Sequence, residues 1–154
     1  MRAMSQDQAS GLVTISAPRQ RLTGMLSHIF LGVRDFDRAL AFYTPLMACL
    51  GQAPRFCDRS RPWAGWQSAG QPRPLLLIGT PHDGQPHEPG NGQMTALLAA
   101  SRGVVDRAHA IALAHGGRCE GPPGLRPDYH PHYYGAYFRD TEGNKLCVAC
   151  HEPE

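Results

Sequence analysis

The sequence lacks any long hydrophobic run, because no stretch approaches the roughly 20 apolar residues that a membrane-spanning helix needs. Its N-terminal segment also lacks the apolar core of about 7–15 residues that is typical of a secretory signal peptide. The five cysteines are an odd number and cannot all pair in disulfides within one chain. We therefore expect a soluble, cytoplasmic protein with reduced thiols and no membrane partner.

The sequence also lacks a large excess of charge of either sign. Fifteen Lys and Arg stand against 13 Asp and Glu, the net charge is +2, and the basic residues are scattered. This pattern gives no basic surface for DNA or RNA, so we expect no nucleic-acid partner. Glycine and proline, by contrast, are abundant, with 17 and 14 residues, and predict many turns between short elements. Residues 1–24 are polar, and we expect an N-terminal extension with "LVTIS" as at most one peripheral strand.

Two segments that lie 66 residues apart share one pattern, a short apolar strand followed by an amphipathic helix. In the first, "LSHIFLGV" precedes a helix with Asp35 as its N-cap and Gly51 at its end. In the second, "QMTALLAA" precedes a helix with Ser101 as its N-cap and Gly117 after its last turn. The agreement of caps, length and stops predicts an internal duplication.

Three short strands are predicted after each helix. They are "APRFCD", "WAGWQSA" and "PLLLIGT" in the first half, and "GRCEG", "YYGAYFRD" and "KLCVACH" in the second. The sequence therefore predicts a single α+β domain over residues 25–151, built of two βαβββ modules at about 25–81 and 92–151 with a Gly/Pro-rich linker. One helix covers only one face of each module, so we expect a curved mixed sheet that forms a cup, with the helices on its outer face.

These motifs resemble the vicinal-oxygen-chelate superfamily, which includes glyoxalases, bleomycin-resistance proteins and extradiol dioxygenases. The resemblance covers residues 26–151 and rests on "LSHIFLGVRDFDRALAFYTPLMACLG", "LLAASRGVVDRAHAIALAHGG" and "GLRPDYHPHYYGAYFRDTEGNKLCVACH". The last motif contains "RDTEGNKL", which is similar to the family's Asp-Pro-Asp-Gly-Asn turn. The resemblance implies a small polar organic ligand in the cup and a homodimer. It also implies a divalent metal ion (Zn, Ni, Mn or Fe) that acts on substrate oxygens as a Lewis acid.

The resemblance places the metal-ligand positions at His28, Met94 and Cys147. His28 stands where the family's first-strand histidine belongs, whereas relatives commonly have His at the position of Met94 and Glu at that of Cys147. A thioether is a weak ligand for hard divalent ions, and a free cysteine on an apolar strand usually packs in the interior. We therefore expect a binding protein with a degenerate metal site. The alternative is an active metal-dependent lyase or isomerase of the lactoylglutathione lyase kind.

Two further hypotheses follow from the same residues. A His, Met and Cys set would suit Cu(I), because copper in that state prefers soft ligands. Alternatively, Cys147 would act as a nucleophile without any metal, with Lys145 and His151 on the same strand face.

Polar and aromatic residues gather in the loop "GLRPDYHPHYY". Arg126 offers a guanidinium fork, and Tyr129 and Tyr134 offer hydroxyl donors, to an anionic or polar ligand. The alternative is a rigid connector whose tyrosines cover the sheet edge. Trp63 and Trp66 are three residues apart on a predicted strand and so face opposite sides, and we assign Trp66 to the ligand. We expect four histidines in proline-rich loops to be solvated: His82, His87, His130 and His132.

Overall fold

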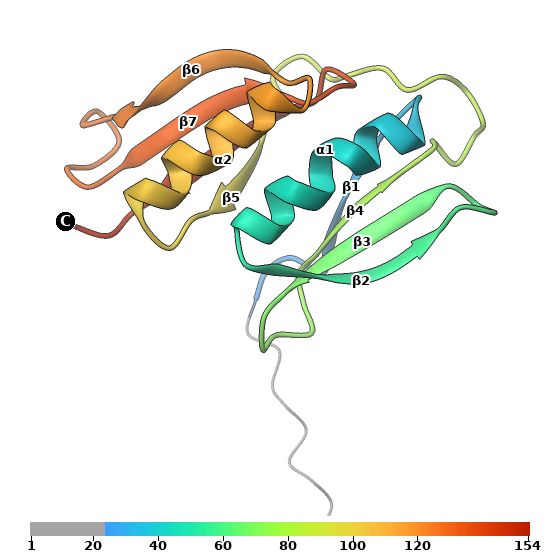
Figure 1. The fold of residues 1–154 in the computed structure, drawn as a ribbon, viewed down its shortest axis with the longest axis horizontal. Helices are drawn as coiled ribbons and strands as arrows, with labels where there is room; N and C mark the ends of the chain where they lie inside the picture. The colour runs from blue at the N-terminus through green and yellow to red at the C-terminus, as the bar shows by residue number, and fades with distance from the viewer. Residues whose placement is uncertain (1–23) are drawn as a thin grey trace, which may run out of the picture.

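The computed structural model describes residues 24–154 and contains two modules of the same element order, strand–helix–strand–strand–strand (Figure 1). The first module comprises β1 (His28–Gly32), α1 (Phe36–Cys49), β2 (Gln52–Asp58), β3 (Trp63–Ser68) and β4 (Leu75–Gly79). The second comprises β5 (Thr95–Leu98), α2 (Arg102–Ala114), β6 (Arg118–Leu125), β7 (Tyr134–Arg139) and β8 (Lys145–Cys150). The segment "LVTIS" lies outside the described residues. No helix within residues 24–154 is long and apolar enough to cross a membrane.

Both helices begin at the predicted caps. The carboxylate of Asp35 accepts a hydrogen bond from the backbone N–H of Arg38 at 3.0 Å. The hydroxyl of Ser101 accepts one from the N–H of Val104 at 3.3 Å. Each side chain thereby satisfies one of the backbone donors that the first turn of a helix leaves free.

The helix ends agree with the sequence in one module only. Gly51 follows α1 with φ of 70°, as predicted. After α2, however, the positive φ of 92° belongs to Gly116, so the predicted stop at Gly117 is wrong by one residue. The shift arises because α2 has 13 residues, one fewer than the 14 of α1. The left-handed residue that ends the helix therefore comes one position earlier.

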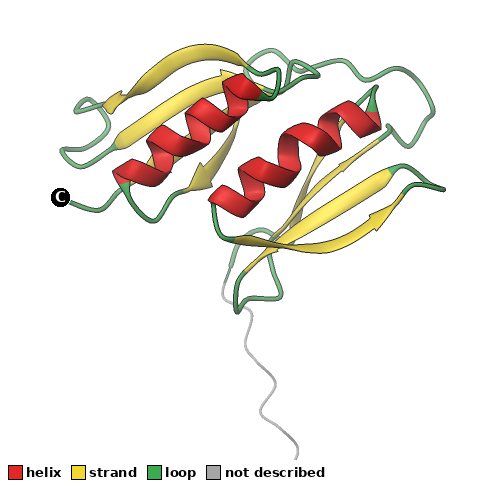
Figure 2. Ribbon diagram, in the orientation of Figure 1, coloured by secondary structure: helices red, strands yellow, loops and turns green. Residues whose placement is uncertain are grey.

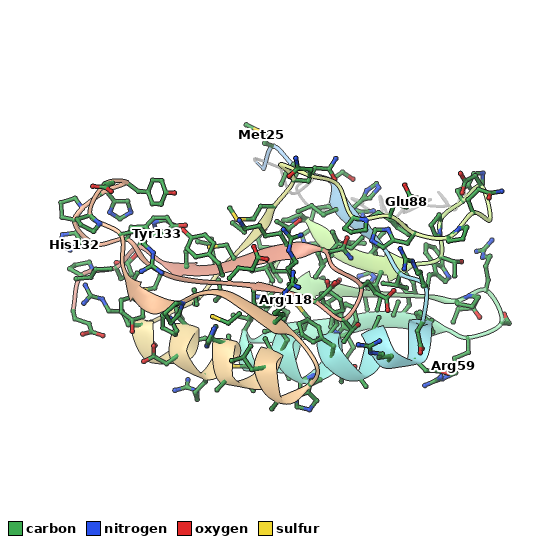
Figure 3. All side chains as sticks on the ribbon, turned by 90° about the horizontal axis from the view of Figure 1, so that it is seen from above. Met25, Arg59, Glu88, Arg118, His132 and Tyr133 are labelled. Atoms are coloured by element: carbon green, nitrogen blue, oxygen red, sulfur yellow. The ribbon has the colours of Figure 1, made fainter. Side chains whose placement is uncertain are left out.

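Each module folds into a four-stranded mixed sheet of the same topology. The strand orders are β1-β4-β3-β2 and β5-β8-β7-β6, and the pairs β1–β4 and β5–β8 are parallel. The two helices lie on the same side of the two sheets, as Figure 2 and the perpendicular view of Figure 3 show. The edge strands β1 and β5 do not hydrogen-bond to each other, so the sheets remain unclosed. The predicted α+β fold of two βαβββ modules with helices on one face is confirmed.

One hydrophobic core joins the helices to the faces of both sheets that the helices cover. The ring of Phe42 on α1 packs edge-on against that of Phe138 on β7, with centroids 6.3 Å apart. Trp66 belongs to this core and is only 4% exposed, and the centroid of its ring lies 6.1 Å from that of Tyr43. The expectation that Trp66 faces the concave side is therefore wrong, because it stands opposite Leu76 on β4, another core residue.

The hairpin turn between β7 and β8 fixes the two modules together. Asp140 is buried in this turn and accepts a 2.6 Å hydrogen bond from the hydroxyl of Tyr43 on α1. The side-chain amide of Asn144 donates to the carbonyl of Gly32 at the end of β1. Burial and, after it, the negative charge of Asp140 raise the pKa of Tyr43 well above its ordinary value, so the phenol stays protonated. The turn thus sets the position of β8 relative to β1.

Candidate functional site on the concave face

We call the face of the two sheets that is opposite the helices the concave face, and strand glycines lie on it in both modules. A Cβ atom added at Gly32 would overlap the ring of His87, and one at Gly79 would lie 3.1 Å from the ring of Phe30. In the second module, a Cβ atom at Gly135 would lie 2.8 Å from the ring of Tyr133. The missing side chains therefore let aromatic rings lie directly against the strand backbone.

The first module carries an open hollow of about 890 Å³ on this face, which we call the first-module hollow. Its lining residues come from β1, from the β2–β3 loop with the first residue of β3, and from the segment after β4: Phe30, Gly32, Arg61, Pro62, Trp63, Thr80, Pro81, His82, Asp83 and His87. Phe30 presents an exposed ring, and the Arg61 guanidinium lies 5.2 Å over the ring of Trp63. The hollow therefore combines aromatic and proline walls with one permanent cation.

His87 is folded onto the face of the first module rather than solvated, which corrects the expectation for this residue. Its side chain is only 8% exposed, and its backbone carbonyl accepts a 2.7 Å hydrogen bond from the side chain of Arg34. The ring nitrogen Nε2 is buried and has no hydrogen-bond partner among residues 24–154. Buried polar atoms normally have a partner, so this nitrogen marks a place where a bound molecule or water would be favoured.

The second module carries a cluster of tyrosines over Cys147. Cys147 is fully buried on β8, and the hydroxyl of Tyr133 lies 3.4 Å from its sulfur. The hydroxyl of Tyr137 lies 3.4 Å from that of Tyr133, and the Arg126 guanidinium lies 5.6 Å over the Tyr137 ring. We call these four side chains, Arg126, Tyr133, Tyr137 and Cys147, the tyrosine cluster.

The electrostatics of the cluster keep the thiol of Cys147 protonated. Burial raises its pKa, and this effect exceeds the opposing effect of the two tyrosine hydroxyls. Burial also raises the pKa of Tyr133, followed by the hydrogen bond to Cys147. Lys145 faces the same side, but its ammonium lies 3.8 Å from a carboxylate oxygen of Glu120. These observations argue against the hypothesis of Cys147 as a nucleophile, because the thiolate is the reactive form.

The three positions that the resemblance assigned to a metal do not form a fitting donor set. His28 is exposed at the start of β1, and its ring nitrogen Nδ1 lies 3.1 Å from the hydroxyl of Ser27. Met94 lies immediately before β5 and is 46% exposed, whereas Cys147 lies beneath Tyr133. Within the described part of the chain, no group of three or more His, Cys, Asp or Glu side chains is placed to hold a metal ion. One imidazole, a thioether and a protonated thiol are a poor match for a hard divalent ion.

The residues predicted to contact a ligand are divided between the two faces. Arg126 reaches the concave face, where its guanidinium also donates to the carbonyls of Leu125 and Pro122. Tyr129 is exposed beside the ring of Tyr133, with centroids 4.9 Å apart. Tyr134 lies on the helix side instead, because its hydroxyl donates to Asp106 of α2 at 2.8 Å.

Several concave-face residues were not predicted as site residues: Phe30, Trp63, His87, Tyr133 and Tyr137. Two sequence signals point to part of this set. Glycines inside predicted strands indicate a close approach by another group. The pairing of β7 with β8 is the other signal. Tyr137 stands directly opposite Cys147 in this register, so the two side chains lie on the same face of the sheet.

The family model described as "Glyoxalase/Bleomycin resistance protein/Dioxygenase superfamily" matches residues 25–148. A glyoxalase/bleomycin resistance protein from Albidiferax ferrireducens T118 is 37% identical, with a TM-score of 0.74, over 82% of this chain and 99% of that one. No curated protein matches the sequence.

More distant structures share the fold. A glyoxalase-related enzyme from Fulvimarina pelagi is 22% identical, with a TM-score of 0.60, over 84% of this chain and 88% of that one. A lactoylglutathione lyase from Agrobacterium tumefaciens is 18% identical, with a TM-score of 0.57, over 85% of this chain and 96% of that one. At these identities the likeness describes the architecture and not the chemistry.

Proposed function

Because the chain belongs to the glyoxalase/bleomycin resistance protein/dioxygenase superfamily, we propose that it is a cytoplasmic binding protein of that family. It holds a small polar organic ligand on its concave face and does not turn the ligand over with a metal ion. The observation that carries this proposal is the burial of Cys147 beneath Tyr133, at the position where the resemblance implies a metal-binding carboxylate. A protonated, covered thiol leaves His28 without a fitting second donor.

The remainder of the concave face supports ligand binding. Arg126 supplies a cation in the second module, and the tyrosine hydroxyls supply donors and acceptors beside it. In the first module the hollow supplies the volume and the apolar surface that small-molecule sites generally have. Polar groups at fixed positions on an apolar wall are the arrangement that gives such sites their specificity.

Metal content tests the proposal directly. The protein would be purified without chelator, offered Zn, Ni, Mn, Fe and Cu in turn, and compared with a His28→Ala variant by elemental analysis. We expect no stoichiometric metal that depends on His28. Stoichiometric, His28-dependent Zn, Ni, Mn or Fe would instead favour the lactoylglutathione lyase alternative, to be assayed with glutathione hemithioacetals. Uptake of copper alone would favour the soft-ligand hypothesis.

Ligand binding is tested separately, with thermal shifts across a library of small polar organic molecules. A ligand on the concave face should raise the melting temperature of the wild type, and Arg126→Met should reduce the shift if the ligand reaches the second module. Arg107→Met is the matched control, because Arg107 is an exposed residue of α2. Figure 3 shows that α2 lies on the other side of the sheets. If no compound shifts the wild type, the proposal of a binding protein loses its support.

We further propose that the chain forms a homodimer through the unpaired edges of β1 and β5. Exposed apolar side chains lie at or next to these edges, and we call them the edge patch: Met25, Leu26, Met94 and Leu98. An apolar patch beside unpaired strand edges favours association with another chain. Sedimentation should therefore give a dimer for the wild type and a monomer for Leu98→Glu. A monomeric wild type would contradict this part of the proposal.

A further inference from the structure

We propose that the first-module hollow is a binding site for a planar aromatic carboxylate. The ligand ring lies against Phe30 and the proline walls, its carboxylate meets Arg61, and a polar atom of the ligand or of a bound water reaches His87. This inference rests on the proposed function, since it names the ligand class and the place where that class is recognised. It assigns recognition to residues of the first-module hollow, which is lined by none of His28, Met94 and Cys147.

The walls of the hollow favour a flat apolar body. Phe30 is 45% exposed although it belongs to a strand, and the missing side chain of Gly79 lets the tip of its ring approach the backbone. Trp63 closes another side and is held in place by Phe56, with ring centroids 4.4 Å apart. Pro62 and Pro81 add rigid apolar surface. Ring-against-ring contact is favourable in such a setting and requires little ordering of the protein.

His87 lines the hollow and carries a buried ring nitrogen that has no hydrogen-bond partner among the described residues. Gly32 has no side chain, so the His87 ring packs against β1, and Arg34 fixes its backbone. This imidazole is therefore held in one place although its Nε2 atom has no partner among the described residues. A polar atom that is buried and positioned, yet unpaired, gains a hydrogen bond when a ligand or an ordered water reaches it.

The charges around the hollow favour an anion. Among residues 24–154, Arg61 is the only Lys or Arg that lines it, and the guanidinium lies over the ring of Trp63. Asp83 is the only lining carboxylate in the described part of the chain, and its oxygen accepts a 3.0 Å hydrogen bond from the backbone N–H of Gln85. The Asp83 carboxylate thus bonds within its own turn. The Arg61 guanidinium makes a charge-assisted pair with the carboxylate of a ligand that enters the hollow.

The test uses 2-naphthoate as the probe and the neutral 2-naphthalenemethanol as its analogue, each titrated into the full chain by calorimetry. The wild type should bind 2-naphthoate more tightly than the alcohol. Arg61→Met should weaken the binding of 2-naphthoate by at least about tenfold, which is the effect of removing one charged hydrogen-bond partner. The same variant should leave the affinity for the alcohol unchanged. His87→Phe should also lower the affinity for 2-naphthoate, and Asp83→Asn should raise it.

Arg107→Met is the matched control, because it removes an equivalent charge from an exposed position of α2. Arg126→Met tests the second module instead. If Arg126→Met weakens 2-naphthoate and Arg61→Met does not, the inference is overturned but the proposed function stands. If 2-naphthoate fails to bind while a non-aromatic polar ligand such as glutathione binds, the ligand class is wrong and the proposed function again stands. If no small molecule binds the wild type, both are overturned. Arg61 lies in the exposed loop between β2 and β3, so its variant should retain the fold.

Discussion

The hydroxyl of Tyr133 lies 3.4 Å from the sulfur of Cys147, so a phenol covers the thiol on the concave face of the second module. Neither group ionises readily there, because burial raises the pKa of both. The position at which the resemblance implies a charged carboxylate is therefore occupied by a neutral pair. This relationship separates the binding function proposed here from the metal-dependent chemistry of glyoxalase-like enzymes.

The first prediction concerns the order in which the cysteines react. Cys57 and Cys119 are exposed, whereas Cys147 is buried with a raised pKa. Iodoacetamide near pH 7 should therefore label Cys57 and Cys119 well before Cys147, as read by peptide mass spectrometry. Tyr133→Ala should speed the labelling of Cys147, and Tyr134→Ala, on the helix side, should not. Fast labelling of Cys147 in the wild type would revive the nucleophile hypothesis.

The second prediction concerns the bond between the two modules. Tyr43→Phe removes the hydrogen bond to buried Asp140 and should lower the free energy of unfolding by about 1.5–3 kcal/mol, the range for bonds to charged groups. Urea titrations of both proteins measure this difference. Tyr134→Phe is the control, because its bond to Asp106 is exposed and should contribute less. Equal losses in the two variants would show that burial of the Tyr43 bond adds nothing.

The third prediction concerns alkaline pH. The pKa values of Tyr43, Tyr133 and Tyr137 are all raised in the folded chain, chiefly by burial. In the unfolded chain these tyrosines ionise near pH 10, so the unfolded state releases protons that the folded state keeps. The stability that they contribute is complete below about pH 10 and falls as the pH rises further.

The free energy of unfolding, measured between about pH 8 and pH 11.5, should therefore decline above about pH 10. The decline should be less steep in Tyr43→Phe, which lacks one of the shifted groups. A free energy that stays constant to the end of this range would contradict the raised pKa values.

The fourth prediction tests the equivalence of the two modules. Asp35 and Ser101 cap α1 and α2 in the same way, so replacing either by Ala should lower the free energy of unfolding by about 1 kcal/mol. Chemical denaturation measures both effects. The reciprocal variants Asp35→Ser and Ser101→Asp should retain most of the stability, since both residue types cap well. A loss from the reciprocal variants as large as that from Ala would mean that the caps are not interchangeable.

The sequence by itself determined the features that depend on neighbouring residues. Asp35 and Ser101 were recognisable as caps because a cap bonds to a backbone group only three residues away. The repeated strand–helix pattern predicted the two modules, and the resemblance carried by motifs such as "RDTEGNKL" implied the family. Local chemistry and periodicity were sufficient for the caps and the modules.

Only the tertiary structure decided which side chains share the concave face. Trp63 and Trp66 were known to point to opposite sides of a strand, but the pairing of β3 with β4 decided which of them enters the core. Tertiary contacts also decided that Tyr133 covers Cys147 and that the ring of His87 packs against Gly32. Strand alternation gives relative faces within one strand, whereas the absolute face depends on register and on contacts between residues far apart in the sequence.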